Sequence, residues 1–275
     1  MYLAIDIGGT KTLLALFSSH GLCLKCFKFK TIPDQKSYEE ALNTHLQNFL
    51  PEKTRDRIRA ITVAIPGVIH FEQKIYSFEF GNLNWPKIDL ITPIKNLLNT
   101  PIFFVNDASL AALYEANRPN TGKGKTIYLT FSTGIGGGIV KNGKLEPSSE
   151  TFEPGHVKYL YNGRLMEWED IASAKALIEA YSSTSISDIP LDESRIKDLA
   201  TRLSLGITDI LVNESPETLI IGGPLAFIYK KLKKPLLDSL VNSVDITSFK
   251  LKKAYRPTES VIYGAYLYSK QHVKE

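Results

Sequence analysis

The chain contains the same arrangement twice: a glycine-centred turn between two apolar strands. IDIGGTKTLLALF begins at Ile5, and FSTGIGGGIVKNG begins at Phe131. Aliphatic runs joined by tight glycine turns are typical of antiparallel strand pairs. Two such pairs so far apart in one chain indicate an ancient duplication, so we expect two halves of similar build.

Strand patterns alternate with helix patterns after each of these pairs. SYEEALNTHLQNFL and RIKDLATRLSLGITDILVN carry apolar residues at helical spacing, whereas IRAITVAI, PIFFV and TLII are typical of buried strands. This alternation predicts the α/β class. The polar loop NRPNTGKGK separates the halves, so we predict an N-terminal α/β domain over residues 1–116 and a C-terminal α/β domain over residues 117–258.

Composition excludes several classes of protein. Hydrophobic residues make up 43% of the chain and charged residues 23%, and no apolar run approaches the roughly 18 residues of a membrane span. The net charge of +4 is too small and too scattered to indicate a nucleic-acid partner. We therefore expect a cytoplasmic protein with neither a membrane nor a nucleic-acid partner.

The first glycine turn has the features of a phosphate site. Asp6 lies near the end of the first strand, and the backbone N–H groups of Gly8, Gly9 and Thr10 can surround an anionic oxygen. A carboxylate beside a phosphate is repelled unless a cation lies between them, which favours hydrated Mg²⁺ at Asp6. Glycine pairs in hairpins often serve only the turn itself, so this motif alone leaves both interpretations open.

Two further glycine turns extend this hypothesis. Thr133 and Gly134 follow the strand KTIYLTF, and Gly222 and Gly223 follow TLII. Three donor-rich turns in one chain could hold successive parts of a nucleotide. The segment GKGKT is not a Walker A loop, because Pro119 stands where that motif needs a glycine.

Polar residues at strand ends supply candidate chemistry. Asn106 and Asp107 close the strand PIFFV and precede a helix, so they can cap that helix. A carboxylate in this position can also accept a proton from a substrate hydroxyl. Glu153 and His156 of EPGH place an acid and an imidazole in one turn. This spacing alone is weak evidence for a functional site.

Taken in order, DIGGTKT, IPG, NDASLAAL, STGIGGG, EPGH, EDIAS and IIGG resemble the ROK family of sugar kinases and sugar-responsive repressors over nearly the whole chain. The resemblance implies the actin-like, hexokinase-like ATPase fold, with two α/β domains and an interdomain cleft, usually assembled as a homodimer. It also implies that the closing helix, about residues 259–275, packs on the N-terminal domain.

The resemblance further assigns roles to residues, with Asp107 as the general base. The residues implied for ATP, with Mg²⁺ near Asp6, are Asp6, Gly8, Gly9, Thr10, Lys11, Thr12, Thr133, Gly134, Gly222 and Gly223. The residues implied for the sugar are Gly67, Asn82, Asn106, Asp107, Glu153, His156 and Glu169. Carboxylates and carboxamides suit a hexose, because its hydroxyls both donate and accept hydrogen bonds.

One departure from the family pattern concerns zinc. ROK proteins commonly follow the E-x-G-H histidine with a run such as CxCGxxGC, whose cysteines join that histidine on a structural zinc. The corresponding stretch here, VKYLYNGRLMEWED, has no cysteine, so we expect no zinc site. We expect apolar packing of Tyr159, Leu160 and Trp168 to hold this loop instead.

The implied activity is transfer of the γ-phosphoryl group of ATP to a hexose, with the 6-hydroxyl of glucose as first choice. N-acetylglucosamine, N-acetylmannosamine and fructose are alternatives, because kinases for these sugars share the residues above. A sugar-responsive regulator is a rival, although DIGGTKT begins at residue 6 and leaves no room for the DNA-binding segment of such proteins. A non-catalytic sugar-binding protein is a further rival, and the joint presence of Asp6, Thr10, Asp107 and Thr133 argues against it.

Overall fold

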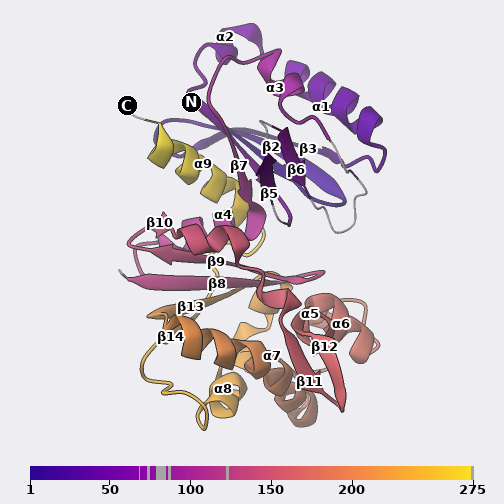
Figure 1. Cartoon of the computed structure of the whole chain (residues 1–275), viewed down its shortest axis with the longest axis vertical. Helices are drawn as coiled ribbons and strands as arrows, with labels where there is room; N and C mark the ends of the chain where they lie inside the picture. Colours follow the sequence, from indigo (N-terminus) through magenta and orange to yellow (C-terminus); the bar gives the residue numbers. More distant parts are fainter. Residues whose placement is uncertain (68, 73–74, 79–84, 86–87, 122–123, 274–275) are drawn as a thin grey trace. The chain divides into compact units, whose positions relative to one another are not determined.

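The computed structural model (Figure 1) describes residues 1–67, 69–72, 75–78, 85, 88–121 and 124–273. The chain divides into two compact units. Unit 1 comprises Met1–Tyr114 and Glu259–Glu275, and unit 2 comprises Glu115–Thr258. Each unit is built on a five-stranded sheet.

The sheet of unit 1 has the strand order β3-β2-β1-β4-β7. Its strands are β1 (Tyr2–Ile7), β2 (Lys11–Phe17), β3 (Cys23–Lys30), β4 (Ala60–Ile65) and β7 (Ile102–Asn106). The first three pair antiparallel, whereas β4 runs parallel to β1 and β7 runs parallel to β4. The carboxyl ends of β1, β4 and β7 therefore meet at one edge of the sheet, where ligands of α/β proteins usually bind.

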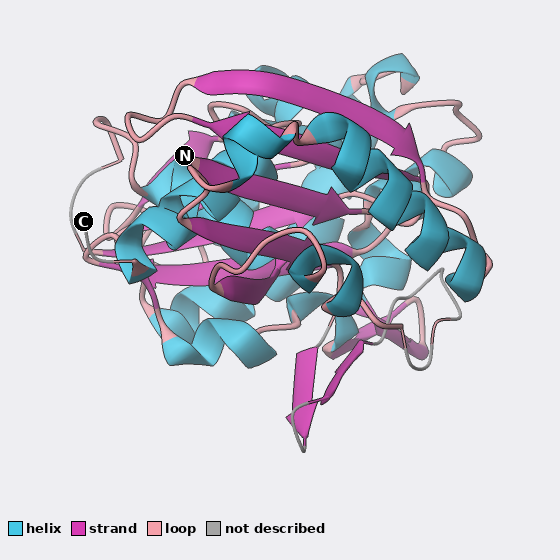
Figure 2. Cartoon of the chain, turned by 90° about the horizontal axis from the view of Figure 1, so that it is seen from above, coloured by secondary structure: helices cyan, strands magenta, loops and turns pink. Residues whose placement is uncertain are grey.

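Helices complete unit 1. They are α1 (Gln35–Phe49), α2 (Glu52–Arg55), α3 (Thr92–Lys95), α4 (Asp107–Ala116), which runs two residues into unit 2, and α9 (Ser260–His272). α9 packs against β1 and β4. A separate hairpin, β5 (Ile69–Glu72) with β6 (Ile75–Phe78), projects away from the sheet (Figure 2).

The sheet of unit 2 has the order β10-β9-β8-β13-β14, which repeats the topology of unit 1. Its strands are β8 (Lys125–Phe131), β9 (Ile135–Lys141), β10 (Lys144–Leu145), β13 (Thr218–Gly222) and β14 (Lys250–Lys253). An antiparallel meander again precedes two strands that run parallel to its first strand. The repeated arrangement in the sequence thus corresponds to a repeated sheet, and the α/β class is confirmed.

Unit 2 carries its own helices and a second small hairpin. The helices are α5 (Trp168–Ala172), α6 (Ala174–Ala180), α7 (Glu193–Glu214) and α8 (Tyr229–Leu240), with short 3-10 turns at Pro147–Thr151, Pro154–His156, Ile186–Asp188 and Pro224–Phe227. The hairpin joins β11 (Lys158–Tyr161) to β12 (Arg164–Glu167). Of the helices in the described part of the chain, none is long and apolar enough to span a bilayer.

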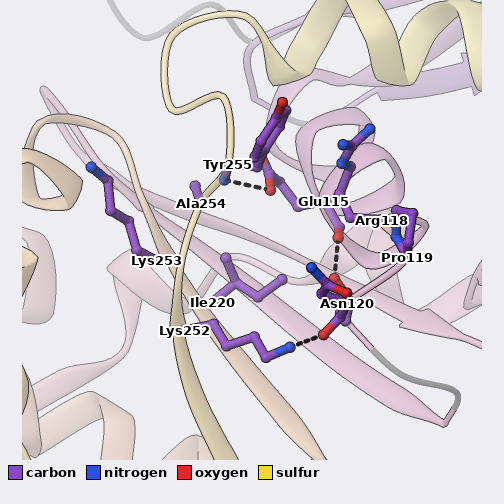
Figure 3. Close-up of a pocket in the computed structure, with 10 residues that line it drawn as sticks. Glu115, Arg118, Pro119, Asn120, Ile220, Lys252, Lys253, Ala254 and Tyr255 are labelled. Carbon is purple, nitrogen blue, oxygen red and sulfur yellow. Dashed lines mark hydrogen bonds between the residues drawn. The ribbon is translucent and has the colours of Figure 1, made fainter.

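A pocket of about 450 Å³ opens on unit 2 beside β13 and β14 (Figure 3). The carboxylate of Glu115, only 2% exposed, accepts the backbone N–H groups of Tyr255 at 2.7 Å and Arg256 at 2.9 Å. The Arg118 guanidinium lies 4.2 Å from the Tyr255 ring centre, and the Lys252 ammonium donates to the carbonyl of Asn120. These contacts join residues near the start of unit 2 to residues near its end. We therefore assign the pocket walls a structural role.

Gly264 brings α9 into backbone contact with α4. An ideal Cβ at Gly264 would lie 1.9 Å from the carbonyl oxygen of Leu110. We expect Gly264→Ala to lower the free energy of unfolding by about 3 kcal/mol, because two packed helices must separate to admit a methyl group. Urea denaturation measures this loss.

Gly163→Ala is the matched control for that measurement. Gly163 has φ +76°, and no neighbouring atom lies within 4 Å of its ideal Cβ, so this change adds backbone strain without a clash. Its expected cost is about 1 kcal/mol. Equal losses in the two variants would contradict the close approach of the helices.

Candidate functional site

Four residues named by the sequence gather at the carboxyl edge of the unit 1 sheet: Asp6 on β1, Gly67 after β4, Asn106 on β7 and Asp107 at the start of α4. The Asn106 amide nitrogen donates to the carbonyl of Gly67 at 3.0 Å, and its oxygen accepts the N–H of Ser109 at 3.0 Å. Asn106 thus caps α4 and ties it to the turn after β4, and its amide nitrogen carries a second hydrogen that can bind a ligand. Asn82, also expected at the sugar, lies outside the described residues.

The carboxylates of Asp6 and Asp107 interact electrostatically. Burial, then the charge of Asp107, raise the pKa of Asp6 against the opposing effect of Lys11, and together they bring it to about 7. Like charges that share a site are relieved by a proton or by a cation. Divalent cations such as Mg²⁺ are bound by carboxylate oxygens, so the residues at this edge fit such an ion.

Thr31, which follows β3, is hydrogen-bonded to the glycine turn between β1 and β2. Its hydroxyl donates to the carbonyl of Gly8 at 2.7 Å, and its N–H donates to the carbonyl of Thr10 at 3.1 Å. The N–H of Gly8 is used within the turn, where it donates to Lys11 at 3.0 Å. In a trans peptide the N–H points opposite to the carbonyl, so the Gly9 N–H points away from Thr31. The turn offers an anion fewer donors than the sequence predicts.

Thr12 requires a correction to the expected phosphate site. Its side chain is fully buried, and its hydroxyl is hydrogen-bonded to the hydroxyls of Thr31 at 3.0 Å and Tyr38 at 2.8 Å. The hydroxyl therefore belongs to the core of unit 1, and only the backbone of Thr12 is left for a ligand. Thr10 and Lys11, by contrast, are exposed.

The turn between β8 and β9 lies at the corresponding edge of unit 2. Ser132 donates its N–H to the carbonyl of Gly134 at 2.9 Å and accepts the N–H of Lys175 at 3.2 Å. These bonds hold Thr133, which is exposed, at the tip of the turn. A compact turn with an exposed hydroxyl at its tip is a suitable anion site.

Gly222 and Gly223 follow the neighbouring parallel strand, β13, at the same edge. Both are buried, and an ideal Cβ at Gly222 would lie 2.1 Å from the Tyr128 hydroxyl. Gly223 has φ +64°, and its ideal Cβ would lie 2.6 Å from the carbonyl of Phe131. Close packing against β8 therefore explains why both positions are glycine. A nucleotide can contact these residues only through their backbone.

The acidic residues predicted to bind sugar meet beside the Gly134 turn. An oxygen of Glu169 accepts the N–H of Ile135 at 3.3 Å. Ideal Cβ atoms at Gly134 and Gly155 would lie 2.5 and 2.8 Å from that same oxygen, so glycine at both positions makes room for the carboxylate. Burial raises the pKa of Glu153, an effect that a neighbouring imidazolium opposes and the Glu169 charge reinforces.

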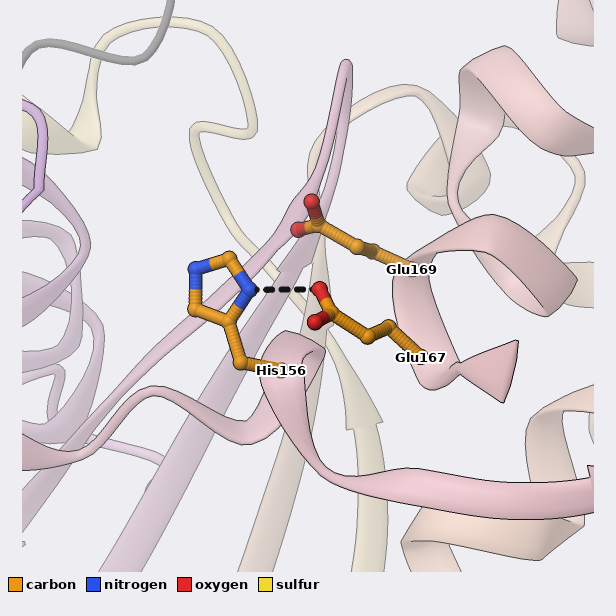
Figure 4. A group of neighbouring side chains, drawn as sticks. All are labelled: His156, Glu167 and Glu169. Atoms are coloured by element: carbon orange, nitrogen blue, oxygen red, sulfur yellow. Dashed lines mark hydrogen bonds and ion pairs between the residues drawn. The ribbon is translucent and has the colours of Figure 1, made fainter. Parts of the chain in front are cut away.

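His156 joins this group and has a partner that the sequence did not reveal. Its Nδ1 lies 2.9 Å from a carboxylate oxygen of Glu167 (Figure 4). This hydrogen bond, followed by the charges of Glu169, Glu167 and Glu153, raises the pKa of His156 against the opposing effect of burial. No motif marks Glu167; the signal that could have found it is Asn-Gly at 162–163, which is typical of a two-residue hairpin turn.

The segment that follows His156 forms a β-hairpin, and one of the three side chains expected to pack it, Leu160, does not. Trp168 is fully buried and Tyr159 is partly buried, as expected, but Leu160 is 73% exposed. In the described part of the chain, single ligand atoms of His156, Glu167 and Glu169 lie within 4.8 Å of one another, a spacing that a metal ion could bridge. The absence of a zinc site remains a prediction.

Each unit therefore carries a donor turn and a group of polar side chains. In unit 1 the group lies at the carboxyl ends of parallel strands, and in unit 2 it lies beside the Gly134 turn. The profile of the ROK family matches residues 2–271. This chain belongs to the ROK family. The family predicted from the ordered motifs is confirmed.

Sequence relatives of this ROK chain include sugar kinases. A fructokinase of Lactococcus lactis subsp. cremoris is 27% identical over 254 residues, which cover 87% of this chain and 82% of the relative. An N-acetyl-D-glucosamine kinase of Histophilus somni (strain 129Pt) is 28% identical over 92% of this chain and 94% of its own.

Solved ROK structures share the fold. A ROK family glucokinase from Streptomyces griseus, in complex with glucose and AMPPNP, aligns with a TM-score of 0.75 and 20% identity over 98% of this chain and 99% of its own. A ROK family transcriptional regulator, a homologue of the E. coli MLC protein, aligns with a TM-score of 0.83 and 22% identity. The alignment covers 98% of this chain and 77% of the regulator. The predicted hexokinase-like, actin-like fold is confirmed.

The carboxylate pair predicts how the stability of this ROK protein depends on pH. The folded-state pKa of Asp6, about 7, exceeds the ordinary value of 3.8, so between these values the folded state binds more protons than the unfolded state. The free energy of unfolding contributed by Asp6 therefore falls as pH rises from about 4 to about 7 and then levels off.

We expect Asp6→Asn to abolish this contribution. Without Mg²⁺, the variant should be more stable than the parent by roughly 2 to 4 kcal/mol at about pH 8, and the difference should shrink toward about pH 4. Urea denaturation across this pH range measures the difference. A difference that does not change with pH would contradict the assignment to Asp6.

Proposed function

We propose that this chain is an ATP-dependent hexose kinase that transfers the γ-phosphoryl group to a sugar hydroxyl, with the 6-hydroxyl of glucose as first choice. An N-acetylhexosamine (N-acetylglucosamine or N-acetylmannosamine) or fructose is the second candidate substrate. The observation that carries the proposal is the position of Asp107, which starts α4 beside Asp6 at the ligand-binding edge of the unit 1 sheet.

In this proposal Asp107 is the general base. It accepts the proton of the sugar hydroxyl as that oxygen attacks phosphorus, which requires the carboxylate to be ionised. The charge of Asp107 disfavours ionisation of Asp6, so a cation at Asp6 keeps both groups charged. Bound Mg·ATP supplies the phosphoryl group and offsets the charge that develops during transfer.

The remaining residues bind and orient the two substrates. We propose that Gly8, Gly9, Thr10, Lys11, Thr133 and Gly134, with the backbone of Thr12, hold phosphates, and that Gly222 and Gly223 lie beside the adenosine. We propose that the sugar is bound by Gly67, Asn82, Asn106, Asp107, Glu153, His156 and Glu169. Most of the catalysis then comes from positioning and electrostatics.

The two compact units correspond to the two domains of the proposed kinase. Closure of one domain on the other would exclude water, which is a competing nucleophile for the phosphoryl group. We also propose a homodimer as the assembled form. Size-exclusion chromatography with light scattering tests this last point.

Asp107→Asn tests the proposed base. The amide cannot accept the hydroxyl proton, so hexose-dependent ADP release should fall by about 10³-fold or more, within the range of general-base effects. The thermal midpoint should not fall, because the amide oxygen can still accept the N–H of Ala108, now 2.7 Å from the carboxylate, and the repulsion with Asp6 is removed. A coupled ADP-release assay over a hexose panel measures both the substrate choice and the loss.

Asp56→Asn is the matched control, since Asp56 is an exposed aspartate of unit 1 and lies in a loop at the end of α2. Its turnover should equal that of the parent. An Asp107→Asn variant that retains normal turnover would overturn the assignment of the base. Hexose binding by the parent with no ADP release would instead favour a non-catalytic sugar-binding protein.

A further inference from the structure

The contact between His156 and Glu167 is set by the geometry of a hairpin. His156 ends the short 3-10 turn before β11, and Glu167 is the last residue of β12. Lys158 pairs with Glu167, so the strand register places Glu167 close to the residues that precede β11. The Nδ1 to Oε2 distance of 2.9 Å is that of a direct hydrogen bond.

The base of this hairpin is anchored in the core of unit 2. The N–H of Trp168, the residue after Glu167, donates to the carbonyl of Val157 at 2.8 Å. The Trp168 ring is fully buried, its Nε1 donates to the carbonyl of Arg202 at 3.1 Å, and it packs so closely on Gly206 that no Cβ fits there. The buried, hydrogen-bonded Trp168 therefore restrains the backbone of Glu167.

The hydrogen bond also fixes which ring nitrogen carries the proton. An ionised carboxylate only accepts hydrogen bonds, so Nδ1 must be the protonated nitrogen of the neutral ring. Nε2 is then left with its lone pair, which can accept a hydroxyl hydrogen, or with a second proton when the ring is charged. Glu153 and Glu169, which interact electrostatically with His156, belong to the proposed sugar-binding group.

Ion-pair strength alone does not explain this contact. The His156 side chain is 60% exposed and that of Glu167 is 33% exposed, and such pairs add little to stability. A carboxylate on one nitrogen of an imidazole does, however, fix the tautomer and orientation of the ring for whatever binds the other nitrogen.

We propose that Glu167 is a positioning residue for sugar binding: by accepting the Nδ1 hydrogen of His156, it holds the imidazole so that Nε2 contacts a hydroxyl of the hexose. This inference rests on the proposed function, because it assumes that a hexose occupies the group formed by Glu153, His156 and Glu169. Glu167 itself does not touch the sugar. Its effect is transmitted through the ring of His156.

The orientation of the ring is tested directly by NMR of the imidazole nitrogens in the intact chain. The chain has five histidines, so the His156 signals are assigned by their loss in His156→Gln. The parent should show the Nδ1–H tautomer, and Glu167→Ala should show mixed tautomers and a lower His156 pKa. The groups that face this ring, Glu153 and Glu169, and Lys158 opposite Glu167, are unchanged in the variant.

The consequence for the sugar is tested by steady-state kinetics. Glu167→Ala should raise the KM for the hexose about 10-fold, leave kcat at saturating hexose within about twofold, and leave the KM for ATP unchanged, as expected for loss of a residue that orients a ligand-binding histidine. Glu167→Asp should restore part of the affinity. Glu179→Gln, which removes an exposed glutamate of α6 in the same unit, should behave like the parent.

The outcomes separate this inference from the proposed function. A parent His156 that lacks the Nδ1–H tautomer, or an unchanged hexose KM in Glu167→Ala, would overturn the positioning role even if the kinase is active. Elemental analysis that finds one divalent metal ion per chain, lost in Glu167→Ala, would also overturn it. If the parent shows no hexose phosphorylation, the kinase proposal fails, and weaker hexose binding by Glu167→Ala in calorimetry would still support the positioning role.

Discussion

The burial of Asp6 beside the charge of Asp107 is the constraint on which the rest of the candidate site depends. The two residues are 101 positions apart, and they come together because β1, β4 and β7 run parallel and end at one edge. Burying carboxylates together costs free energy unless a proton or a cation compensates. A carboxylate pair at the edge where ligands of α/β proteins usually bind is therefore better explained by a charged ligand than by stability.

The duplicated architecture divides the chemistry between the two units. Unit 1 and unit 2 repeat one sheet topology, but the strand β8 has no carboxylate in the place that Asp6 takes near the end of β1. Unit 2 instead supplies the Thr133 turn and a hydrogen-bonding group ordered around Glu169, which two glycines accommodate. We propose that unit 1 provides the acid-base and cation-binding groups, whereas both units provide donors and acceptors that recognise the substrates.

Much of this could be predicted from the sequence, because strand periodicity, glycine turns and residues at strand ends are local features. The two similar sheets, the position of Asp107 at a helix start and the convergence of Glu153, His156 and Glu169 all followed from such patterns or from the ordered motifs. The role of Thr12 did not, because its burial depends on Thr31 and Tyr38, which come from other elements. Glu167 was missed for the same reason, since its partner lies eleven residues away across a hairpin whose strands carry little apolar alternation. The strand β14, with the sequence KLKK, also lacks a clear strand pattern and is set by pairing with β13.

The most direct test of the central claim is a crystal structure of the chain with Mg²⁺, a non-hydrolysable ATP analogue and glucose. The account predicts that a carboxylate oxygen of Asp107 lies within about 3 Å of the sugar 6-hydroxyl, and that this hydroxyl faces the γ-phosphorus. It also predicts that Asp6 lies next to the cation. Glucose bound with its 6-hydroxyl turned away from Asp107, or nucleotide phosphates bound away from the turns at Gly9 and Thr133, would contradict it.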